Sequence, residues 1–370
     1  MAKAGDGGRQ RAELVLRSPP GFEERIYWPH SIAAIVAELA KQGIDAQAAL
    51  EGADLTASQL DAYTTKISYR QLDIVIRNAL RLSSDPAIAL RAGQRMHVTS
   101  YGMYGYALLS GATQAESRSF AARYLRIVGP FCDVVDVDEG PTVAVTFEPL
   151  HWPNPTEDAH RFAVEFALSA HLAVARDRTG QTFSFSRVNV DYAAPPHAKV
   201  YDSLFECPVL FEQQSCGYEH VREDDLAELA DPRTHAMARE MCEQLLGEVN
   251  RAGGVAADVW RILVERPGRF PGIKAIALKM EMYPRALRRK LEAEGTSYSA
   301  LLAEVRRRLA IEYLRKTQMV NKEIASRLGY SDEANFRHAF MRWTGKSPTE
   351  FRGRARTRRP GGQSLKPPDH

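Results

Sequence analysis

One stretch constrains the fold of this chain more than any other: residues 323–351, EIASRLGYSDEANFRHAFMRWTGKSPTEF. Ile324 and Leu328 recur there at the spacing of one helix face. Gly329 follows at once, and glycine adopts a left-handed turn conformation without steric cost. Ser331 is then a suitable N-cap for a second helix. We therefore predict two helices joined by a tight turn, with Gly329 as the turn residue and Ser331 as the cap.

The second helix of this pair has one apolar and one polar face. Phe336, Phe340 and Trp343 follow each other at intervals of four and three residues and predict a buried stripe. Two helices joined this tightly, with a polar and basic second helix, are typical of a DNA-reading helix-turn-helix. The residues off the stripe that a partner can reach include Glu333, Ala334, Asn335, Arg337 and His338.

A second pair of helices is predicted upstream, over residues 272–298. Pro284 suits the first turn of its second helix. The arginines of that helix that lie away from its buried positions are Arg285, Arg288 and Arg289. An arginine can bind guanine O6 and N7 through two hydrogen bonds in the major groove. For any single arginine, a phosphate contact or a solvated position is the simpler alternative, but three on one short helix favour DNA contact.

Between the two pairs lies a long amphipathic helix, residues 300–317. Leu302, Val305, Leu309 and Tyr313 give it one packed face. Such a spacer would hold two recognition helices in adjacent major-groove segments, about 34 Å apart on one face of B-DNA. A monomer could then read two half-sites.

The net charge of +3 hides an uneven distribution. Residues 260–359 hold 24 Lys and Arg against 10 Asp and Glu, whereas the rest of the chain holds 25 against 36. A localised cationic domain is the electrostatic footprint of phosphate-backbone binding. Charge alone would equally fit a basic surface that only aids solubility. The helix-turn-helix pattern favours the interpretation as a DNA-binding domain.

The composition excludes several classes of protein. A chain of 370 residues, 44% of them hydrophobic, can bury two or three cores. No apolar run reaches 18 residues, and the N-terminus lacks an apolar signal segment, so we expect a cytoplasmic protein that does not bind membranes. The four cysteines are far apart with no C-x-x-C pair, which argues against a disulfide framework or a zinc site. We expect no metal ion and no cofactor.

The part of the chain before the cationic domain predicts an α+β domain. Helical patterns fill most of residues 29–90, and residues 132–137 and 142–147 predict a β-hairpin. Further predicted elements are a helix over 157–176, a strand over 182–192 and an edge strand over 204–211, which contains Pro208.

These patterns predict five segments. They are a mobile N-terminal segment (1–28), an α+β ligand-binding and dimerisation domain (29–225), a helical connector with a hinge (226–254), an all-α DNA-binding domain with two helix-turn-helix motifs joined by a spacer helix (255–353), and a disordered basic tail (354–370).

A candidate ligand pocket lies in the aromatic segment YGMYGYALL, residues 101–109. Tyr101, Tyr104 and Tyr106 could line such a pocket. The simpler alternative is that the segment opens a buried helix. His160 and His171 could share a helix face, but packed or solvated histidines are the simpler interpretation than a metal pair. Because no phosphate-binding, dinucleotide-binding, zinc-protease or nucleophile-elbow motif occurs, we expect no catalytic residue.

With these motifs in place, residues 260–352 resemble the DNA-binding domain of AraC/XylS-type transcription regulators. The resemblance rests on RALRRKLEAEGTSY, LLAEVRRRLAIEYL and EIASRLGYSDEANFRHAFMRWTGKSP. Residues 45–225 resemble the arabinose-binding-type N-terminal domain of one branch of that family (OruR/ArgR-like), on YGYALLSGATQAESRSFAARYLRIVGP and LFECPVLFE. The resemblance implies a cytoplasmic bacterial activator or repressor. Its implied partners are a double-stranded DNA operator, RNA polymerase if it activates, a small-molecule effector and a second copy of the chain.

The resemblance also implies roles for individual residues. Arg285, Arg288 and Arg289 match base-facing positions of the first recognition helix. Glu333, Ala334 and His338 match those of the second, and Asn335 and Arg337 match phosphate-side positions. The first motif departs from the family pattern at two positions of its turn. Glu281 stands where glycine is usual, and Tyr283 stands where a small N-cap residue is usual.

Three functions therefore remain open from the sequence. The first is a sequence-specific, ligand-responsive transcription regulator. The second is a regulator whose N-terminal domain only dimerises and takes no ligand. The third is an enzyme that uses the DNA-binding module for delivery, although no nucleophile with a base partner is visible.

Overall fold

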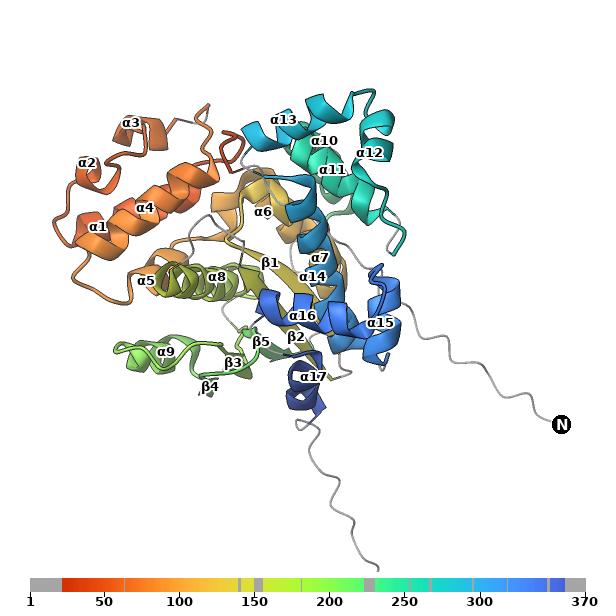
Figure 1. The fold of residues 1–370 in the computed structure, drawn as a ribbon. Coiled ribbons are helices and arrows are strands. Elements are labelled where there is room, and N and C mark those ends of the chain that lie inside the picture. Colours follow the sequence, from red (N-terminus) through yellow and green to blue (C-terminus); the bar gives the residue numbers. More distant parts are fainter. Residues whose placement is uncertain are drawn as a thin grey trace, which may run out of the picture. The chain divides into compact units, whose positions relative to one another are not determined.

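The computed structural model describes residues 22–62, 64–138, 141–149, 156–180, 182–222, 230–252, 254–265, 268–294, 296–317, 319–344 and 347–356. The chain forms two compact units that separate after Gly254, and each is described by itself (Figure 1). Among the described residues, no helix combines the length and the apolar character needed to cross a membrane.

The N-terminal unit begins with a group of helices, drawn in red and orange in Figure 1. The strongest local signal belongs to α4, where Ser68 and Gln71 form a capping box at its start. The helices of the unit up to the sheet are α1 (His30–Lys41), α2 (Ala46–Ala49), α3 (Ala57–Leu60), α4 (Tyr69–Leu82), α5 (Ile88–Gln94), the 3-10 helix η1 (Val98–Tyr101), α6 (Gly102–Ser110), α7 (Gln114–Tyr124) and the 3-10 helix η2 (Leu125–Val128).

A five-stranded mixed sheet follows, in the order β1-β2-β5-β3-β4. Its strands are β1 (Cys132–Asp138), β2 (Thr142–Pro149), β3 (Arg187–Asn189), β4 (Val209–Leu210) and β5 (Cys216–Val221). β1 and β2 are antiparallel, with Val134 opposite Phe147, which confirms the predicted hairpin. Among the described residues β4 pairs with β3 alone, in parallel, so the edge position predicted for this strand is confirmed. Its predicted bounds, 204–211, were wrong, because the strand covers only Val209–Leu210 and residues 204 and 205 end helix α9.

Two further sequence predictions for the sheet were wrong. The strand predicted over 182–192 is only Arg187–Asn189, because pairing with β5 covers those three residues alone. The central strand β5 was missed, since its six residues include glycine, glutamate and histidine and show no clear alternation. Gly217 is needed there, because a Cβ at this position would lie 2.0 Å from the Val145 carbonyl oxygen.

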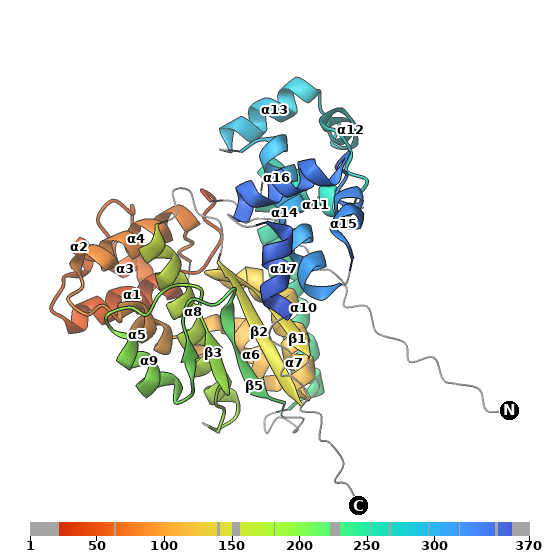
Figure 2. The same cartoon turned by 60° about the horizontal axis from the view of Figure 1, so that its bottom comes forward.

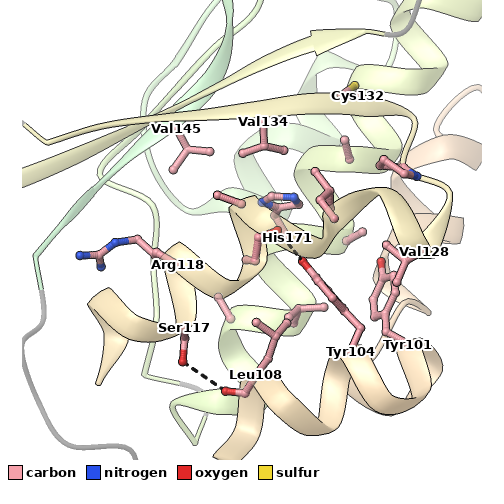
Figure 3. Close-up of a pocket in the computed structure, with 18 of the residues that line it drawn as sticks. Tyr101, Tyr104, Leu108, Ser117, Arg118, Val128, Cys132, Val134, Val145 and His171 are labelled. Carbon is pink, nitrogen blue, oxygen red and sulfur yellow. Dashed lines mark hydrogen bonds between the residues drawn. The ribbon is translucent and has the colours of Figure 1, made fainter. Parts of the chain in front are cut away.

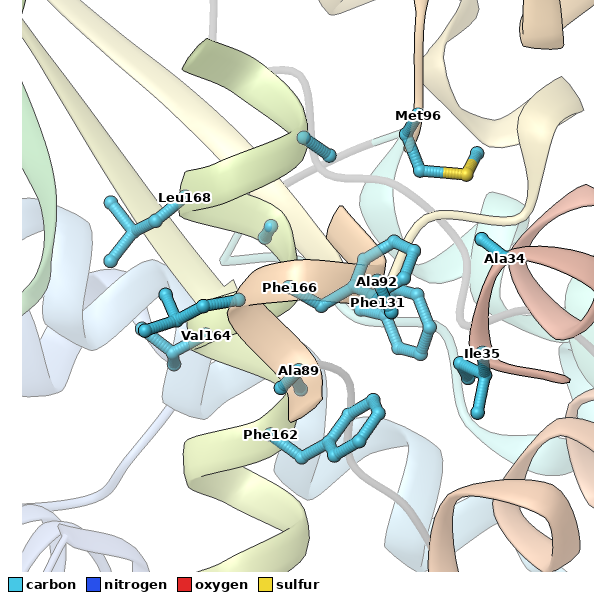
Figure 4. Close-up of a cluster of buried hydrophobic side chains, with 14 of the residues drawn as sticks. Ala34, Ile35, Ala89, Ala92, Met96, Phe131, Phe162, Val164, Phe166 and Leu168 are labelled. Carbon is cyan, nitrogen blue, oxygen red and sulfur yellow. The ribbon is translucent and has the colours of Figure 1, made fainter. Parts of the chain in front are cut away.

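The long helix α8 (Glu157–Arg178) packs on one face of the sheet (Figure 2). Thr156 caps its start, and Glu157 and Asp158 complement the helix dipole. Phe162, Phe166 and Leu168 of this helix enter the main core, where the rings of Phe131 and Phe166 meet at a tilt with their centroids 4.2 Å apart (Figure 4). The α+β character predicted for this unit is thereby confirmed. The unit also contains α9 (Ala198–Phe205) and α10 (Pro232–Ala252).

The structure departs from the predicted segments at three places. Residues 22–28 are not a loose lead-in, because Tyr27 is buried and pairs with Ile67 through a backbone hydrogen bond of 2.7 Å. Helix α10, predicted as part of a connector, packs against α6 and buries Ala238 and Cys242 within the N-terminal unit. The predicted tail begins inside the last helix, which runs to Arg356, and residues 357–370 lie outside the described residues.

The C-terminal unit consists of helices and the turns between them, with no strand among its described residues. It consists of α11 (Gly254–Val264), α12 (Ile273–Lys279), α13 (Pro284–Ala293), α14 (Tyr298–Lys316), α15 (Asn321–Arg327), α16 (Glu333–Thr344) and α17 (Pro348–Arg356). One apolar cluster joins both predicted helix-turn-helix pairs to the spacer α14, and it includes Leu287, Val305 and Phe336 at 0% exposure. The predicted all-α domain with two such pairs and a spacer helix is confirmed.

Candidate DNA interface and effector cavity

The two helix pairs of the C-terminal unit are closed by the same kind of turn. In the second pair Gly329 has φ +70°, and the Tyr330 N–H donates to the Ala325 carbonyl at 2.9 Å. In the first pair Glu281 takes the same place with φ +54°, and the Met282 N–H donates to the Ala277 carbonyl at 2.8 Å. A glutamate in the left-handed region is strained, so the departure seen in the sequence has a conformational cost.

The two recognition helices begin differently. α16 is capped by the Asp332 side chain, which accepts the Asn335 N–H at 2.7 Å. The predicted cap, Ser331, was wrong by one residue: its hydroxyl donates to the Asp332 carboxylate at 3.0 Å and supports the cap from outside. α13 has Tyr283 at its N-cap with no side-chain hydrogen bond, and that ring is 84% exposed.

The predicted contact residues of α13 are all on its outer face. Arg285, Arg288 and Arg289 are exposed, and Leu287 and Leu291 on the other face are completely buried. Within the described part of the chain, none of the three arginines has an ion-pair partner. Their charges are therefore available to an external anion.

The arginines of the spacer α14 behave differently. Glu304 binds Arg307 at 2.8 Å and Arg308 at 2.9 Å, and both guanidinium groups are mostly buried. Arg306 donates to the Gly329 carbonyl at 3.1 Å and lies over the Tyr330 ring. These three positive charges are thus used inside the unit, and α13 carries a larger share of the available cationic surface than the sequence alone indicated.

The predicted contact residues of α16 are also exposed, but they are chemically mixed. Glu333, Ala334, Arg337 and His338 have exposed side chains. Asn335 is exposed as well, yet its amide donates to Ser331 and Asp332 at 3.1 and 2.7 Å, so it already serves the cap.

Three of the predicted contact residues occupy the same positions in α13 and α16 when each helix is numbered from its first residue. Arg285 matches Ala334, Arg288 matches Arg337, and Arg289 matches His338. The first helix thus presents arginine at three positions where the second presents a methyl group, an arginine and an imidazole.

The N-terminal unit contains a cavity of about 160 Å³ between the sheet, α8 and the α6–α7 pair (Figure 3). Its walls are mainly apolar and include Leu108, Val128, Val134, Val145 and Phe166. For scale, an apolar cavity of about 150 Å³ is large enough to bind benzene. This cavity is the right size for a small, compact molecule.

Two of the three predicted pocket tyrosines line this cavity. Tyr101 and Tyr104 do so, with their rings 6.0 Å apart at centroid (Figure 3). Tyr106 was predicted wrongly: two residues beyond Tyr104 it lies about 200° further round α6, and it is 47% exposed at the surface.

Three of the polar groups at the cavity, Arg118, His171 and Arg178, come from the two helices α7 and α8. His171 of α8 is enclosed, and burial lowers its pKa to about 4, so its ring is neutral at pH 7. Arg178 donates Nε–H to the Leu108 carbonyl at 3.1 Å, and burial lowers its pKa. Arg118 lies at the edge of the cavity (Figure 3), and the described residues give neither arginine an ion-pair partner. The sequence analysis considered His171 only as a possible metal ligand and did not predict Arg118 or Arg178 as cavity residues, because α7 and α8 are brought together only by tertiary packing.

Two helix-turn-helix pairs joined by one buried spacer, preceded by an α+β domain with an internal cavity, define a class of two-domain DNA-binding regulators. Comparisons with known proteins agree with this class. Residues 43–228 match the family model described as the arabinose-binding domain of AraC transcription regulator, and residues 276–354 match a helix-turn-helix domain model.

Several known proteins are similar to the chain over most of its length. The Ornithine utilization regulator of Pseudomonas aeruginosa is 32% identical over 342 residues, which cover 91% of this chain and 99% of that protein. An HTH-type transcriptional regulator of Mycobacterium bovis is 28% identical over 342 residues, 90% of this chain and 98% of its own. The crystal structure of the regulator CdpR from Pseudomonas aeruginosa covers 89% of this chain and all of that chain, at 24% identity and a TM-score of 0.47.

The chain belongs to the AraC family of transcription regulators, in the group with an arabinose-binding-type N-terminal domain. It is a DNA-binding transcription regulator, as the two helix-turn-helix motifs predict.

Proposed function

We propose that the protein reads its operator with two recognition helices placed in adjacent major-groove segments, and that a small molecule in the N-terminal cavity controls it. The observation that carries the first part is the outer face of α13, where Arg285, Arg288 and Arg289 are exposed and have no ion-pair partner among the described residues. Arginine is the side chain best suited to bind guanine through two hydrogen bonds. α16 supplies Glu333, Ala334 and His338 to base edges, with Asn335 and Arg337 toward phosphates.

Alanine substitution of one base-reading residue in each helix tests this assignment. We expect Arg289→Ala and His338→Ala each to weaken binding to the operator by about 1–3 kcal/mol. The operator is recovered by selection from a random duplex pool with the unaltered protein, and a scrambled duplex serves for comparison. A matched control is Arg261→Ala, because Arg261 is an exposed arginine of the same unit that pairs with Asp258. Equal losses on operator and scrambled duplexes would show that the residues touch only phosphate.

The cavity supports a particular kind of effector. Its size limits the ligand to a small molecule, its walls favour an apolar body, and Arg118 and Arg178 favour an anionic end. We therefore propose a small carboxylate with a compact apolar group. A cationic group near the anionic end of the ligand would be repelled by the same arginines.

Thermal shift measurements with benzoate and hexanoate, each against its neutral amide, test the effector proposal. A ligand that binds only the folded state raises the Tm. At a ligand concentration 100 times its Kd, the free energy of unfolding increases by about 2.7 kcal/mol. We expect the carboxylates to act and the amides to fail, and Arg118→Gln to weaken the carboxylate effect. Ala121→Leu, which fills the cavity from α7, should abolish it. Equal shifts from acid and amide would remove the anionic requirement.

We also propose that the protein forms a homodimer through its N-terminal unit. α6 and α10 pack together and expose Tyr106, Met237 and Met241, which are 47%, 55% and 41% exposed. Several exposed apolar side chains on two packed helices, unlike a single one, are typical of a contact surface. Light scattering of the double variant Met237→Glu/Met241→Glu should show a monomer. Val221→Glu, which changes a single apolar residue that is 60% exposed at the end of β5, should leave the dimer intact.

We propose finally that the protein acts in the cytoplasm and has no catalytic activity, with RNA polymerase as a further partner if it activates transcription. Two similar proteins, the Ornithine utilization regulator and the HTH-type regulator of Mycobacterium bovis, are named as regulators and not as enzymes. Purified protein that cleaves or modifies its own operator duplex would overturn the second statement.

A further inference from the structure

Three donor side chains converge at one place in the N-terminal unit that belongs to neither site above. His160 comes from the first turn of α8, Asp191 from the segment just after β3, and Cys216 from the start of β5. Their ligand atoms all lie within 4.8 Å of one another, and no other group of three such side chains meets that distance in the described part of the chain.

The Asp191 carboxylate is the centre of this cluster. Its Oδ1 lies 2.9 Å from His160 Nε2, and the Cys216 thiol donates to the same oxygen at 3.0 Å. In a tetrahedral zinc site with Zn–S about 2.3 Å and Zn–N and Zn–O about 2.0–2.2 Å, the donor atoms stand roughly 3.3–3.6 Å apart. Opening each hydrogen bond by about half an ångström would therefore admit the ion.

The donor types identify the class of ion. One thiolate, one imidazole and one carboxylate suit zinc and similar borderline-soft divalent cations. Calcium and magnesium prefer all-oxygen ligand sets, which this cluster does not offer.

The cluster is anchored on one side and open on the other. Cys216 is only 2% exposed and is held by the pairing of β5 with β2, where it stands opposite Phe147. The side chains of His160 and Asp191 are 35% and 37% exposed, which gives an ion an entry path and a position for water as the fourth ligand. The Tyr192 ring meets the His160 imidazole edge to face and limits its rotation.

We propose that His160, Asp191 and Cys216 form a binding site for a zinc-class divalent cation. Such an ion would join the start of α8 to the start of β5, two elements whose later residues line the effector cavity. Binding would therefore stiffen two walls of that cavity without entering it.

The simpler alternative is a hydrogen-bonded triad that never binds metal, and thiolate ligation separates the two. In that triad the Cys216 thiol keeps its proton and donates it to Asp191 Oδ1 at 3.0 Å. A metal must displace that proton to gain the thiolate.

The test uses full-length, untagged protein that is stripped with a chelator and kept reduced. Zn²⁺ is titrated in competition with a chromophoric chelator, and Co²⁺ serves as a spectroscopic probe of thiolate ligation. We expect one equivalent of Zn²⁺ and a cobalt–thiolate absorption band in the unaltered protein. Cys216→Ala should lose the band, and Cys216→Ala, Asp191→Asn and His160→Gln should each bind Zn²⁺ at least about tenfold more weakly.

Cys242→Ala is the matched control, because Cys242 is also a buried cysteine but lies in α10. It should bind Zn²⁺ as the unaltered protein does. Operator binding and Tm show whether each variant folds. If Cys216→Ala does not fold, Asp191→Asn and His160→Gln, which change partly exposed side chains, still provide the test. Failure of the unaltered protein to compete for one equivalent of Zn²⁺, or equal affinity in Cys216→Ala, would overturn the proposal.

Discussion

The two helix-turn-helix motifs of this protein have the same left-handed turn between their helices, but they form it with different residues. The second uses Gly329 at its left-handed turn and Asp332 as a cap, whereas the first uses Glu281 and the uncapped Tyr283. The two motifs also differ in charge: α13 carries four basic residues against one acidic residue, and α16 carries two against one. The second motif, with a glycine turn and a capped helix, thus has the less positively charged recognition helix, and the first motif, with a strained turn, has the more positively charged one.

The irregularity of the first motif is local to its turn, and core substitutions test this. Leu287 and Phe336 are both completely buried in the one cluster that includes α14. We expect Leu287→Ala to cost about 2–5 kcal/mol and Phe336→Ala about 3–5 kcal/mol, because each leaves a cavity in a shared core. Denaturant unfolding monitored by Trp fluorescence and by circular dichroism should show that each variant lowers the stability of the whole C-terminal unit. Loss of only the first motif in Leu287→Ala would mean that it is a separate, looser unit.

The register of the two helices gives a sharper comparison. Arg288 and Arg337 occupy equivalent fifth positions, yet we assign the first to bases and the second to phosphate. We expect Arg288→Ala to lose about 1–3 kcal/mol on the operator and little on a scrambled duplex. Arg337→Ala should weaken both alike and reduce the salt slope of binding by about one. Identical behaviour of the two variants would show that position, not helix identity, sets the role.

The cap of the second recognition helix is expected to have a smaller effect, on stability. Asp332→Ala should lower the Tm by a few degrees, because the Asn335 N–H loses its acceptor. The Asn335 hydrogen bond, first, and the Ser331 hydroxyl lower the pKa of Asp332 in the folded state. Its contribution is therefore present above the pKa of the unfolded chain and is lost as the pH falls below about 4. Ser331→Ala should change Tm less, since that residue only supports the cap, and a larger effect from Ser331→Ala would contradict this assignment.

Repair of the first turn should give the smallest effect. Glu281→Gly should stabilise the C-terminal unit by up to about 1 kcal/mol, as relief of left-handed strain exceeds the added chain entropy of glycine. Thermal unfolding of the unit checks this. Gly329→Ala, the reverse change in the second motif, should destabilise, because its φ is +70°. A destabilising Glu281→Gly would show that the glutamate makes a contribution other than filling the turn.

The sequence predicted well what depends on local pattern. Periodic apolar residues and a turn glycine predicted α15 and α16, and the same kind of pattern predicted α12, α13, α14 and the β1–β2 hairpin. The cap was placed at Ser331 instead of Asp332 because adjacent residues of equal capping ability cannot be separated by pattern alone.

Features that depend on distant contacts were not predictable in this way. β5 gains its place from pairing with β2 and β3, not from its own alternation. The α10 helix has the spacing of a connector but packs on α6. The cavity collects Tyr101, Arg118 and Arg178 from separate elements, and His160 finds its partners, Asp191 and Cys216, 31 and 56 residues away.

The central claim is that the first recognition helix supplies more of the binding energy than the second. The most direct measurement compares two variants on the selected operator at one salt concentration: Arg285→Ala/Arg288→Ala/Arg289→Ala in α13, and Glu333→Ala/Arg337→Ala/His338→Ala in α16. We predict that the α13 variant loses at least about tenfold more affinity than the α16 variant, with both folded by Tm. Equal losses, or a larger loss in the α16 variant, would contradict the account.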